Sequence, residues 1–243
     1  MVLFFGVFGC GPRSKSSAVE IKKTDFQPLS LEDSKFLITP TLYYVPSYDQ
    51  STSDCTEMKT LKNEHGKVLI NVCKNIFANC LMQGTCQIRT GGQKILINVG
   101  PVIDGEQRFN VIKNSACIFG TGNAPSNLKK PTVMCLDPYY SVAADLNLYS
   151  TGDIVFIPSV VGLAMPDGST HDGYFIVRDS GQAIKGFGRF DFFTGFTLNK
   201  SENPLAQAGF GDRNMHRSYE IITGDRVDEI LKRRNYPLIP VKN

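Results

Sequence analysis

The sequence lacks the patterns that define several common classes of protein. It holds no P-loop, no motif typical of RNA or DNA binding and no internal repeat, and its net charge is only +3. So small a charge gives no argument for a nucleic-acid partner, although it does not exclude an anionic polymer. We expect no nucleic acid among its partners. At 42% hydrophobic and 10% aromatic residues, the 243-residue chain can bury the core of one large or two small domains.

The leading apolar run is also short. It covers Met1–Gly9 and ends at Cys10, after which the chain turns polar. A bilayer span needs roughly 20 apolar residues, so this run is typical of the h-region of a secretory signal. The ending Val7-Phe8-Gly9-Cys10 resembles a bacterial lipoprotein cleavage box. We expect lipidation at Cys10 and, because the charged n-region is missing, a true start further upstream. The alternative is a frayed apolar N-terminus.

Seven cysteines are present, and none forms a Cys-x-x-Cys pair. This absence argues against a zinc knuckle and against disulfide exchange. If Cys10 is lipidated, an even number remains for disulfides, whose connectivity the sequence leaves open. Disulfides persist outside the reducing cytosol, so we expect an exported protein on the periplasmic face of the bacterial envelope. The candidates are Cys55, Cys73, Cys80, Cys86, Cys117 and Cys135.

The chain divides into four parts by composition. Residues 1–10 are a signal remnant, 11–35 a polar tether, 36–135 a cysteine-rich β region and 136–243 a second β-rich part. Alternating apolar runs separated by turn signals predict a mainly β body, either a barrel or a sandwich. We expect one clear helix at Asp225–Arg234 and a second, short one at Ser141–Asn147, with loop at 47–66.

Two aspartates stand inside apolar β-runs, which is unusual because strands disfavour aspartate and an unpaired carboxylate is costly to desolvate. Asp179 ends one run, Asp191 lies within the next, and the glycine-rich segment Gly181–Gly188 joins them. We interpret the pair as part of a site. The simpler alternative is that both cap turns.

These residues resemble a known family. Asp145 precedes Gly152 and the run Ile154–Ile157, and Arg178–Gly186 reads Arg-Asp-Ser-Gly-Gln-Ala-Ile-Lys-Gly, followed by Arg189–Phe193. The pattern resembles the three-aspartate (3D) domain of membrane-bound lytic murein transglycosylase A and related cell-wall lytic proteins. The resemblance covers about residues 135–223. It departs at Gln182, where glycine is common.

The resemblance implies a double-psi β-barrel in which three aspartates converge. It implies a lytic transglycosylase, a carbon–oxygen lyase that cleaves the MurNAc–GlcNAc bond of peptidoglycan and leaves a 1,6-anhydro sugar. By that resemblance Asp191 is the catalytic acid, and Asp179 and Asp145 support it. It implies glycan strands as partner, no cofactor, no metal and an outer-membrane lipoprotein; we expect a monomer. The second hypothesis is a non-catalytic envelope lipoprotein that binds glycan strands or proteins.

The reaction that the resemblance implies needs only one acidic side chain. Attack by the sugar's own C6 hydroxyl is intramolecular, so one carboxyl can first donate and then accept a proton. Asp191 must then rest protonated, and we expect phenylalanines 190, 192 and 193 and an ionised Asp179 to raise its pKa.

Further candidates for substrate binding are Lys185, Gly181 and Tyr174. Lys185 either orients Asp179 or contacts a muramyl carboxylate, or else only stabilises the turn. Gly181 fits a backbone turn better than ligand contact. Tyr174 is a candidate for stacking on sugar, although core packing is an equal alternative. Asp212 and His216 make too weak a pair for a metal site, and we favour a cap at Asp212.

Overall fold

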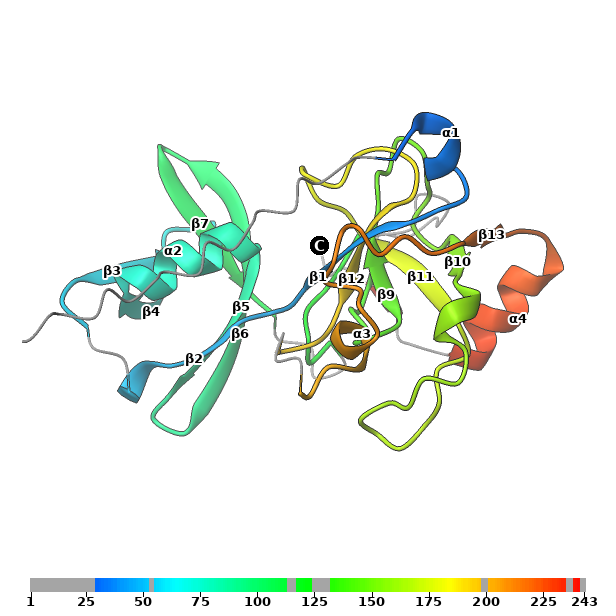
Figure 1. Cartoon of the computed structure of the whole chain (residues 1–243). Helices are drawn as coiled ribbons and strands as arrows, with labels where there is room; N and C mark the ends of the chain where they lie inside the picture. Colours follow the sequence, from blue (N-terminus) through cyan, green and yellow to red (C-terminus); the bar gives the residue numbers. More distant parts are fainter. Residues whose placement is uncertain are drawn as a thin grey trace, which may run out of the picture.

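The computed structural model describes residues 29–52, 55–112, 117–123, 132–197, 201–234 and 238–240. The expected lipidation site Cys10 and most of the expected tether lie outside these residues. Among the described residues, no helix has both the length and the apolar character needed to cross a membrane. The described chain forms two lobes, each built on a six-stranded mixed sheet (Figure 1).

The first sheet has the strand order β1-β12-β9-β11-β10-β13. Its central strands are paired in both directions: β9 runs parallel to β11 and antiparallel to β12. One face is covered by the largest core cluster, which includes Val142, Val177 and Phe192. The strands are β1 (Thr39–Tyr43), β9 (Ser141–Ala143), β10 (Ile154–Phe156), β11 (Tyr174–Asp179), β12 (Arg189–Phe193) and β13 (Glu220–Ile222).

The second sheet has the order β2-β5-β6-β7-β3-β4 and is covered by helix α2 (Lys74–Gln83). The buried helix residues Ile76 and Cys80 pack with Leu61 and Phe109 of the sheet. A small third sheet pairs β8 (Thr132–Met134) with β14 (Leu238–Pro240). The strands of the second sheet are β2 (Ser47–Asp49), β3 (Met58–Lys62), β4 (Val68–Cys73), β5 (Thr85–Thr90), β6 (Gln93–Ile103) and β7 (Glu106–Val111).

The remaining elements are short, apart from one helix. They are α1 (Leu31–Ser34), η1 (Gln50–Thr52), η2 (Pro158–Val160), α3 (Pro204–Gln207) and the longer α4 (Asp225–Arg234). Helix α4 packs through Ile230 on the first sheet, at the end of the lobe that Figure 1 shows farthest from the second sheet.

The chain passes from one sheet to the other directly between β1 and β2. A cluster around Val45 joins the lobes: Val45 and Phe193 are buried with Leu96 of the second sheet and Leu136. The two sheets therefore share packed apolar side chains close to the end of β12, beside the strand that carries Asp191.

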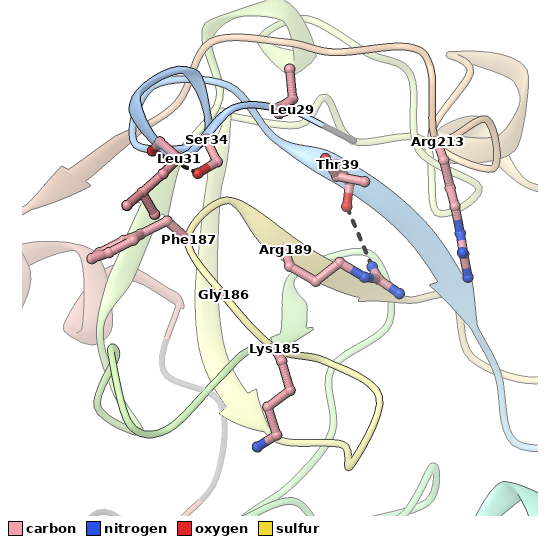
Figure 2. A pocket seen from close by; sticks show the side chains of 9 residues that line it. All are labelled: Leu29, Leu31, Ser34, Thr39, Lys185, Gly186, Phe187, Arg189 and Arg213. Atoms are coloured by element: carbon pink, nitrogen blue, oxygen red, sulfur yellow. Dashed lines mark hydrogen bonds between the residues drawn. The ribbon is translucent and has the colours of Figure 1, made fainter. Parts of the chain in front are cut away.

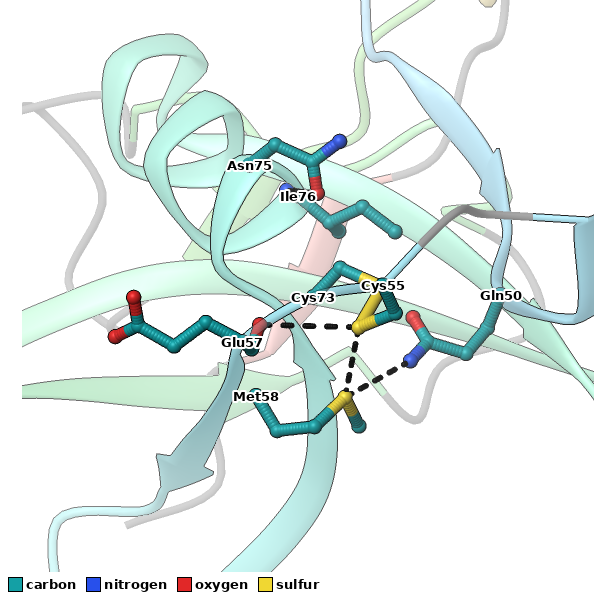
Figure 3. The surroundings of a disulfide bond; sticks show 7 residues. All are labelled: Gln50, Cys55, Glu57, Met58, Cys73, Asn75 and Ile76. Carbon is teal, nitrogen blue, oxygen red and sulfur yellow. Dashed lines mark hydrogen bonds between the residues drawn. A yellow bond between two sulfur atoms is a disulfide. The ribbon is translucent and has the colours of Figure 1, made fainter.

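Three disulfides form: Cys55–Cys73, Cys80–Cys86 and Cys117–Cys135. The expected use of all six cysteines is confirmed, and the structure supplies the pairing that the sequence left open. Figure 3 shows Cys55–Cys73 at the point where β4 meets α2, next to Met58 at the start of β3. Cys117–Cys135 joins two segments in the lobe of the first sheet, close to β11.

The mainly β fold is confirmed, whereas the double-psi barrel is not. Strands β1 and β13 end the first sheet, and among the described residues a single bridge, Leu37 with Ser218, links the segments that lead into them. Two backbone hydrogen bonds flank this bridge, from Ile38 N to Arg217 O and from Tyr219 N to Phe36 O. The ends of the sheet thus approach one another, but no ladder of described strands closes it.

Helix α4 has the bounds expected from the sequence, Asp225–Arg234. The helix expected at 141–147 is wrong, because Ser141–Ala143 forms β9 at the centre of the sheet and only a turn follows. The sequence analysis also missed α2, and it assigned to loop a region that contains β2 and β3. Tertiary pairing decides these short elements, so local pattern does not predict them well.

A buried ion pair fastens α4 to the sheet. Arg234 donates two hydrogen bonds to Asp137, from Nε at 2.6 Å and from Nη2 at 2.8 Å, and Asp137 is almost fully buried. The buried Arg178 lies 3.9 Å from the same carboxylate. The neighbouring Arg233 instead pairs with the exposed Asp172 at 2.8 Å.

We predict that Arg234→Met lowers the free energy of unfolding by about 2–4 kcal/mol, because it leaves a buried carboxylate with only Arg178 to compensate it. The matched variant Arg233→Met should cost less than about 1 kcal/mol, because that pair is exposed. Urea denaturation of both variants measures the difference. Equal losses would contradict the role given to Asp137.

Candidate functional site

Four residues form one row across the first sheet. Thr41 of β1 pairs with Asp191 of β12, Asp191 pairs with Ala143 of β9, and Ala143 pairs in turn with Asp179 of β11. Directly paired residues point to the same face of a sheet. Neighbouring strands lie about 4.8 Å apart, so the backbones of the two aspartates are separated by roughly 10 Å. The small Ala143 between them leaves the space open for their carboxyl groups.

A β-bulge creates this row. The register of β11 on β9 shifts between Val177, which pairs with Val142, and Asp179, which pairs with Ala143. The extra residue is Arg178, whose side chain is buried and donates to Cys135 O. Without the bulge, Arg178 would stand opposite Ala143. The bulge therefore brings Asp179 into the row with Asp191, which is a typical use of such irregularities.

Tyr43 connects the two aspartates from β1. Its hydroxyl donates to Asp179 Oδ2 at 3.1 Å, and its ring packs against Phe193, with ring centroids 5.1 Å apart. Burial, the hydrogen bond and the charges of Asp179 and Asp191 raise the pKa of Tyr43 well above its usual value. The phenol thus stays protonated and serves as a hydrogen-bond donor. The backbone N–H of Ser180 also donates to Asp179, at 2.8 Å.

Asp191 is held in a chain of polar contacts. Thr41 Oγ1 donates to Asp191 Oδ1 at 2.6 Å and accepts from Arg189 Nη1 at 2.8 Å. Asp191 lines a cavity of about 570 Å³, whose other polar lining residues include Arg189 and Arg213. Of the three candidate aspartates, Asp191 is the one found among the residues that line this cavity. It is therefore the carboxyl placed to meet a ligand there.

Burial raises the pKa of both members of the pair, but their surroundings differ. The pKa of Asp179 rises to about 6, mainly through burial and further through the charge of Asp191, against the hydrogen bonds from Ser180 and Tyr43. Burial also raises the pKa of Asp191, while Thr41, Arg189 and Arg213 hold it down. The two carboxyl groups therefore titrate as a coupled pair, which keeps its last proton up to about pH 6.

The expected rise in the pKa of Asp191 is confirmed, and its main cause is burial. Phe190 and Phe192 alternate with Asp191 along β12 and point into the core on the opposite face, so the expectation that these two rings bury the carboxyl is wrong. The repulsion between the two carboxylates opposes the ionisation of the pair, as expected. Phe193 lies on the other side of the sheet from those two rings, packed with Val45, and remains close to the site through Tyr43.

Asp145 has a separate task. It is buried and accepts hydrogen bonds from Gly186 N at 3.0 Å and Asn147 N at 3.1 Å, which together with Lys185 lower its pKa. Gly186 adopts a φ of 95°, a conformation that favours glycine. Asp145 thus fixes the segment between Asp179 and Asp191. We describe it as a positioning residue.

Two of the three substrate-binding candidates, Lys185 and Gly181, line one small cavity, and the third lies elsewhere. Lys185 Nζ is 3.5 Å from Asp145 Oδ1, so it pairs with this aspartate and not with Asp179. Gly181 accepts from Ile184 N in a turn, and a Cβ there would come within 2.9 Å of Ile184. Its role in the backbone turn fits the simpler expectation.

Tyr174 lies apart from the aspartates. It begins β11, about 17 Å from Asp179 at the other end of the strand. Its ring packs against Phe156, and its hydroxyl accepts from Arg226 of α4 at 2.7 Å. The structure therefore gives Tyr174 a packing role beneath α4 and does not bring it to the cavity at Asp191.

Sequence reasoning missed Thr41, Tyr43, Arg189 and Arg213. The first two lie on β1, far from the aspartates in sequence, and only the parallel pairing of β1 with β12 brings them there. The sequence could have predicted that Arg189 lies at the site, since it lies two residues before Asp191 and so shares its face of β12. His216 Nδ1 donates to Ile38 O at 3.0 Å, and Asp212 accepts from Asn214 N in a turn. Among the described residues, no group of His, Cys, Asp or Glu is suited to hold a metal.

Comparison with known proteins identifies the class. Residues 140–209 match the family model of the 3D domain, so this chain carries a 3D domain, and Asp145, Asp179 and Asp191 all lie within the match. The resemblance expected from the sequence is confirmed at this level. No curated protein matches the chain in sequence.

Several solved structures are similar in shape. E. coli MltA with bound chitohexaose has 14% identity and a TM-score of 0.48, covering 76% of this chain and 71% of that chain. A membrane-bound lytic murein transglycosylase from Agrobacterium tumefaciens has 13% identity and a TM-score of 0.43, covering 82% and 76%. The lytic transglycosylase LtgG of Burkholderia pseudomallei has 16% identity and a TM-score of 0.38, covering 76% and 70%. These are distant likenesses.

We predict that Asp179→Asn stabilises the protein at neutral pH. The folded-state pKa of about 6 exceeds the ordinary value of 3.8, so the folded state binds more protons and stability falls as pH rises from about 4 to 6. The amide removes this loss, worth up to about 3 kcal/mol at pH 7. Thermal denaturation from pH 4 to 7 measures it. A variant that tracks the wild type at every pH would show that Asp179 titrates normally.

Proposed function

We propose that this protein is a lytic transglycosylase that cleaves the MurNAc–GlcNAc bond of peptidoglycan and forms a 1,6-anhydro product. The observation that carries the proposal is the arrangement of Asp191, which lines a cavity of about 570 Å³ while it is held by Thr41 and accompanied by the half-buried Asp179. The 3D domain match over residues 140–209 supports it. A glycan-cleaving enzyme needs an acid at such a position.

The site suits a mechanism with one acid. Ordinary glycosidases use two carboxyl groups that both face the substrate. Here Asp191 faces the cavity, whereas Asp179 is bonded to Tyr43 and Ser180, and Asp145 to the segment at Gly186. Attack by the C6 hydroxyl of the sugar itself requires no second carboxyl, because the nucleophile is tethered to the reacting carbon.

Asp191 acts twice in this reaction. It first donates its proton to the glycosidic oxygen, and the C–O bond to the leaving sugar breaks. The resulting carboxylate then takes the proton of the C6 hydroxyl as its oxygen bonds to C1, which closes the anhydro ring and restores the acid. The role of Asp179 is to keep the proton in the pair up to about pH 6. A glycan that covers the cavity removes water from Asp191 and moves this proton to it.

Localisation follows from the cysteines. The three disulfides use every cysteine except Cys10, and disulfides persist in oxidising compartments. We propose a lipoprotein anchored through Cys10 at the periplasmic face of the envelope, in the outer membrane, with residues 11–35 as its tether. In this proposal 36–135 forms the disulfide-stapled part and 136–243 the three-aspartate domain, which acts on glycan strands as a monomer without a cofactor.

The direct test is digestion of purified peptidoglycan, followed by mass analysis for anhydro-muropeptides. Wild-type protein should release them, and Asp191→Asn should reduce the rate by roughly 10²- to 10⁴-fold, because the acid is lost. Asp172→Asn is the matched control, since Asp172 is exposed and pairs with Arg233. Equal release by wild type and Asp191→Asn would show that Asp191 is not the acid, and no release by either would favour a binding protein for glycan strands or partner proteins.

The pH dependence provides a separate check. We expect the rate of release to fall as pH rises through about 6, where the aspartate pair loses its last proton. In Asp179→Asn the fall should begin at lower pH, because the remaining proton on Asp191 is held less tightly beside Arg189 and Arg213. Release measured from pH 4 to 8 gives both curves. Coincident curves would exclude a proton shared between the two groups.

A further inference from the structure

A second cavity adjoins the first. It measures about 390 Å³, and Figure 2 shows the side chains that line it. Arg189 and Arg213 line both cavities, so the two are neighbours that meet at these guanidinium groups. The cavity at Asp191 therefore continues into a second hollow that the mechanism above does not use.

The charge of the second cavity is one-sided. Its lining includes three cations, Lys185, Arg189 and Arg213, and no aspartate or glutamate. In Figure 2 the guanidinium groups of Arg189 and Arg213 lie on one side, Leu31 and Phe187 lie on the other, and the Lys185 ammonium points away from them, in keeping with its pair with Asp145. Burial lowers the pKa of Arg189, the charge of Asp191 raises it, and the like charge of Arg213 lowers it.

Hydrogen bonds hold the guanidinium group of Arg189 at the boundary between the two cavities. Its Nη1 donates to Thr41 Oγ1 at 2.8 Å, to Phe190 O at 3.0 Å and to Thr39 O at 3.3 Å. A guanidinium carries five N–H donors, and its fork matches a carboxylate. Since these bonds all use Nη1, they fix the plane of the group at the boundary between the cavities. A bound anion would relieve the repulsion between Arg189 and Arg213 and accept from both.

We propose that this second cavity binds a carboxylate carried by the substrate, and that the bound carboxylate favours the protonated form of Asp191 by neutralising Arg189 and Arg213. The inference rests on the proposed function and adds a substrate class to it: glycans that carry carboxylates close to the scissile bond. Such carboxylates have two sources in peptidoglycan, the lactyl group of a peptide-free muramic acid and the peptide stem. The apolar side chains of Leu31 and Phe187 suit the aliphatic part of either.

The carboxylate of the substrate would act on Asp191 through Arg189 and Arg213. Arg189 reaches Asp191 through Thr41, and the charges of Arg189 and Arg213 both lower the pKa of Asp191 in the free protein. A carboxylate on the two arginines cancels this effect, so the pKa of Asp191 rises when the correct substrate binds. A neutral glycan would raise the pKa of Asp191 only by excluding water, and the charges of Arg189 and Arg213 would still oppose that rise.

Binding to the Asp191→Asn protein tests the site separately from catalysis. Calorimetry with chitohexaose, peptide-free murein strands and peptide-bearing murein strands should show one or both carboxylate-bearing glycans binding at least roughly tenfold more tightly than chitohexaose. Which of the two binds more tightly identifies the lactyl or the peptide source. Adding Arg213→Gln should remove this preference, while adding Arg226→Gln, on the exposed surface of α4, should keep it. Equal affinity for all three glycans would contradict the proposal that the second cavity binds a carboxylate.

Proton uptake by the wild-type protein tests the link to Asp191. Calorimetry at pH 6 in two buffers of different ionisation enthalpy should detect uptake of a fraction of a proton on binding N-acetylmuramic acid, and none with N-acetylglucosamine. Arg213→Gln should abolish the uptake, and Arg213→Lys should restore part of it. Tight binding without uptake would leave a carboxylate site that has no influence on the acid. If the site passes both tests but peptidoglycan is not cleaved, the proposed catalysis fails and the binding site stands.

Discussion

The register of β11 on β9 is the constraint on which the site depends. The bulge at Arg178 sets Asp179 opposite Ala143, and Ala143 stands opposite Asp191. Two half-buried carboxyl groups on one face, with only the methyl group of Ala143 on the strand between them, cannot both ionise at little cost. The pair therefore holds a proton in a range where isolated aspartates hold none. The other features of the site, the phenol of Tyr43 and the hydroxyl of Thr41, orient these two groups.

The side chains around the pair separate the roles of its members. Asp179 is half-buried, accepts hydrogen bonds from Tyr43 and Ser180, and lies near the charge of Asp191. Asp191 faces the cavity and lies near two arginines that favour its ionised form. The two cations oppose the protonated form of Asp191, whereas the proposed reaction begins from that form. Binding of the substrate offers a way to reconcile the two. Under the proposed function, a carboxylate bound beside Arg189 and Arg213 would offset their charge and favour the protonated form of Asp191.

The sequence predicted the aspartates and their chemistry better than their surroundings. Aspartates inside apolar runs and the glycine-rich segment between them are local signals, and α4 has a clear apolar face. The helix is confirmed and the two aspartates do lie in one row, whereas their catalytic roles remain predictions. Tyr43 and Thr41 carry no local signal, because they reach the site through a parallel pairing of strands 150 residues apart. The bulge at Arg178 is equally hidden, since it arises from pairing with β9. The strands 141–143 and 58–62 are too short for local pattern to outweigh tertiary pairing.

The central claim is that Asp179 and Asp191 share one proton in the folded protein. Carbon-13 NMR titration of the two carboxyl carbons measures this directly. The account predicts two coupled steps, with Asp191 contributing mainly to the first and Asp179 losing the last proton near pH 6. Two independent titrations close to the ordinary value of aspartate would contradict it.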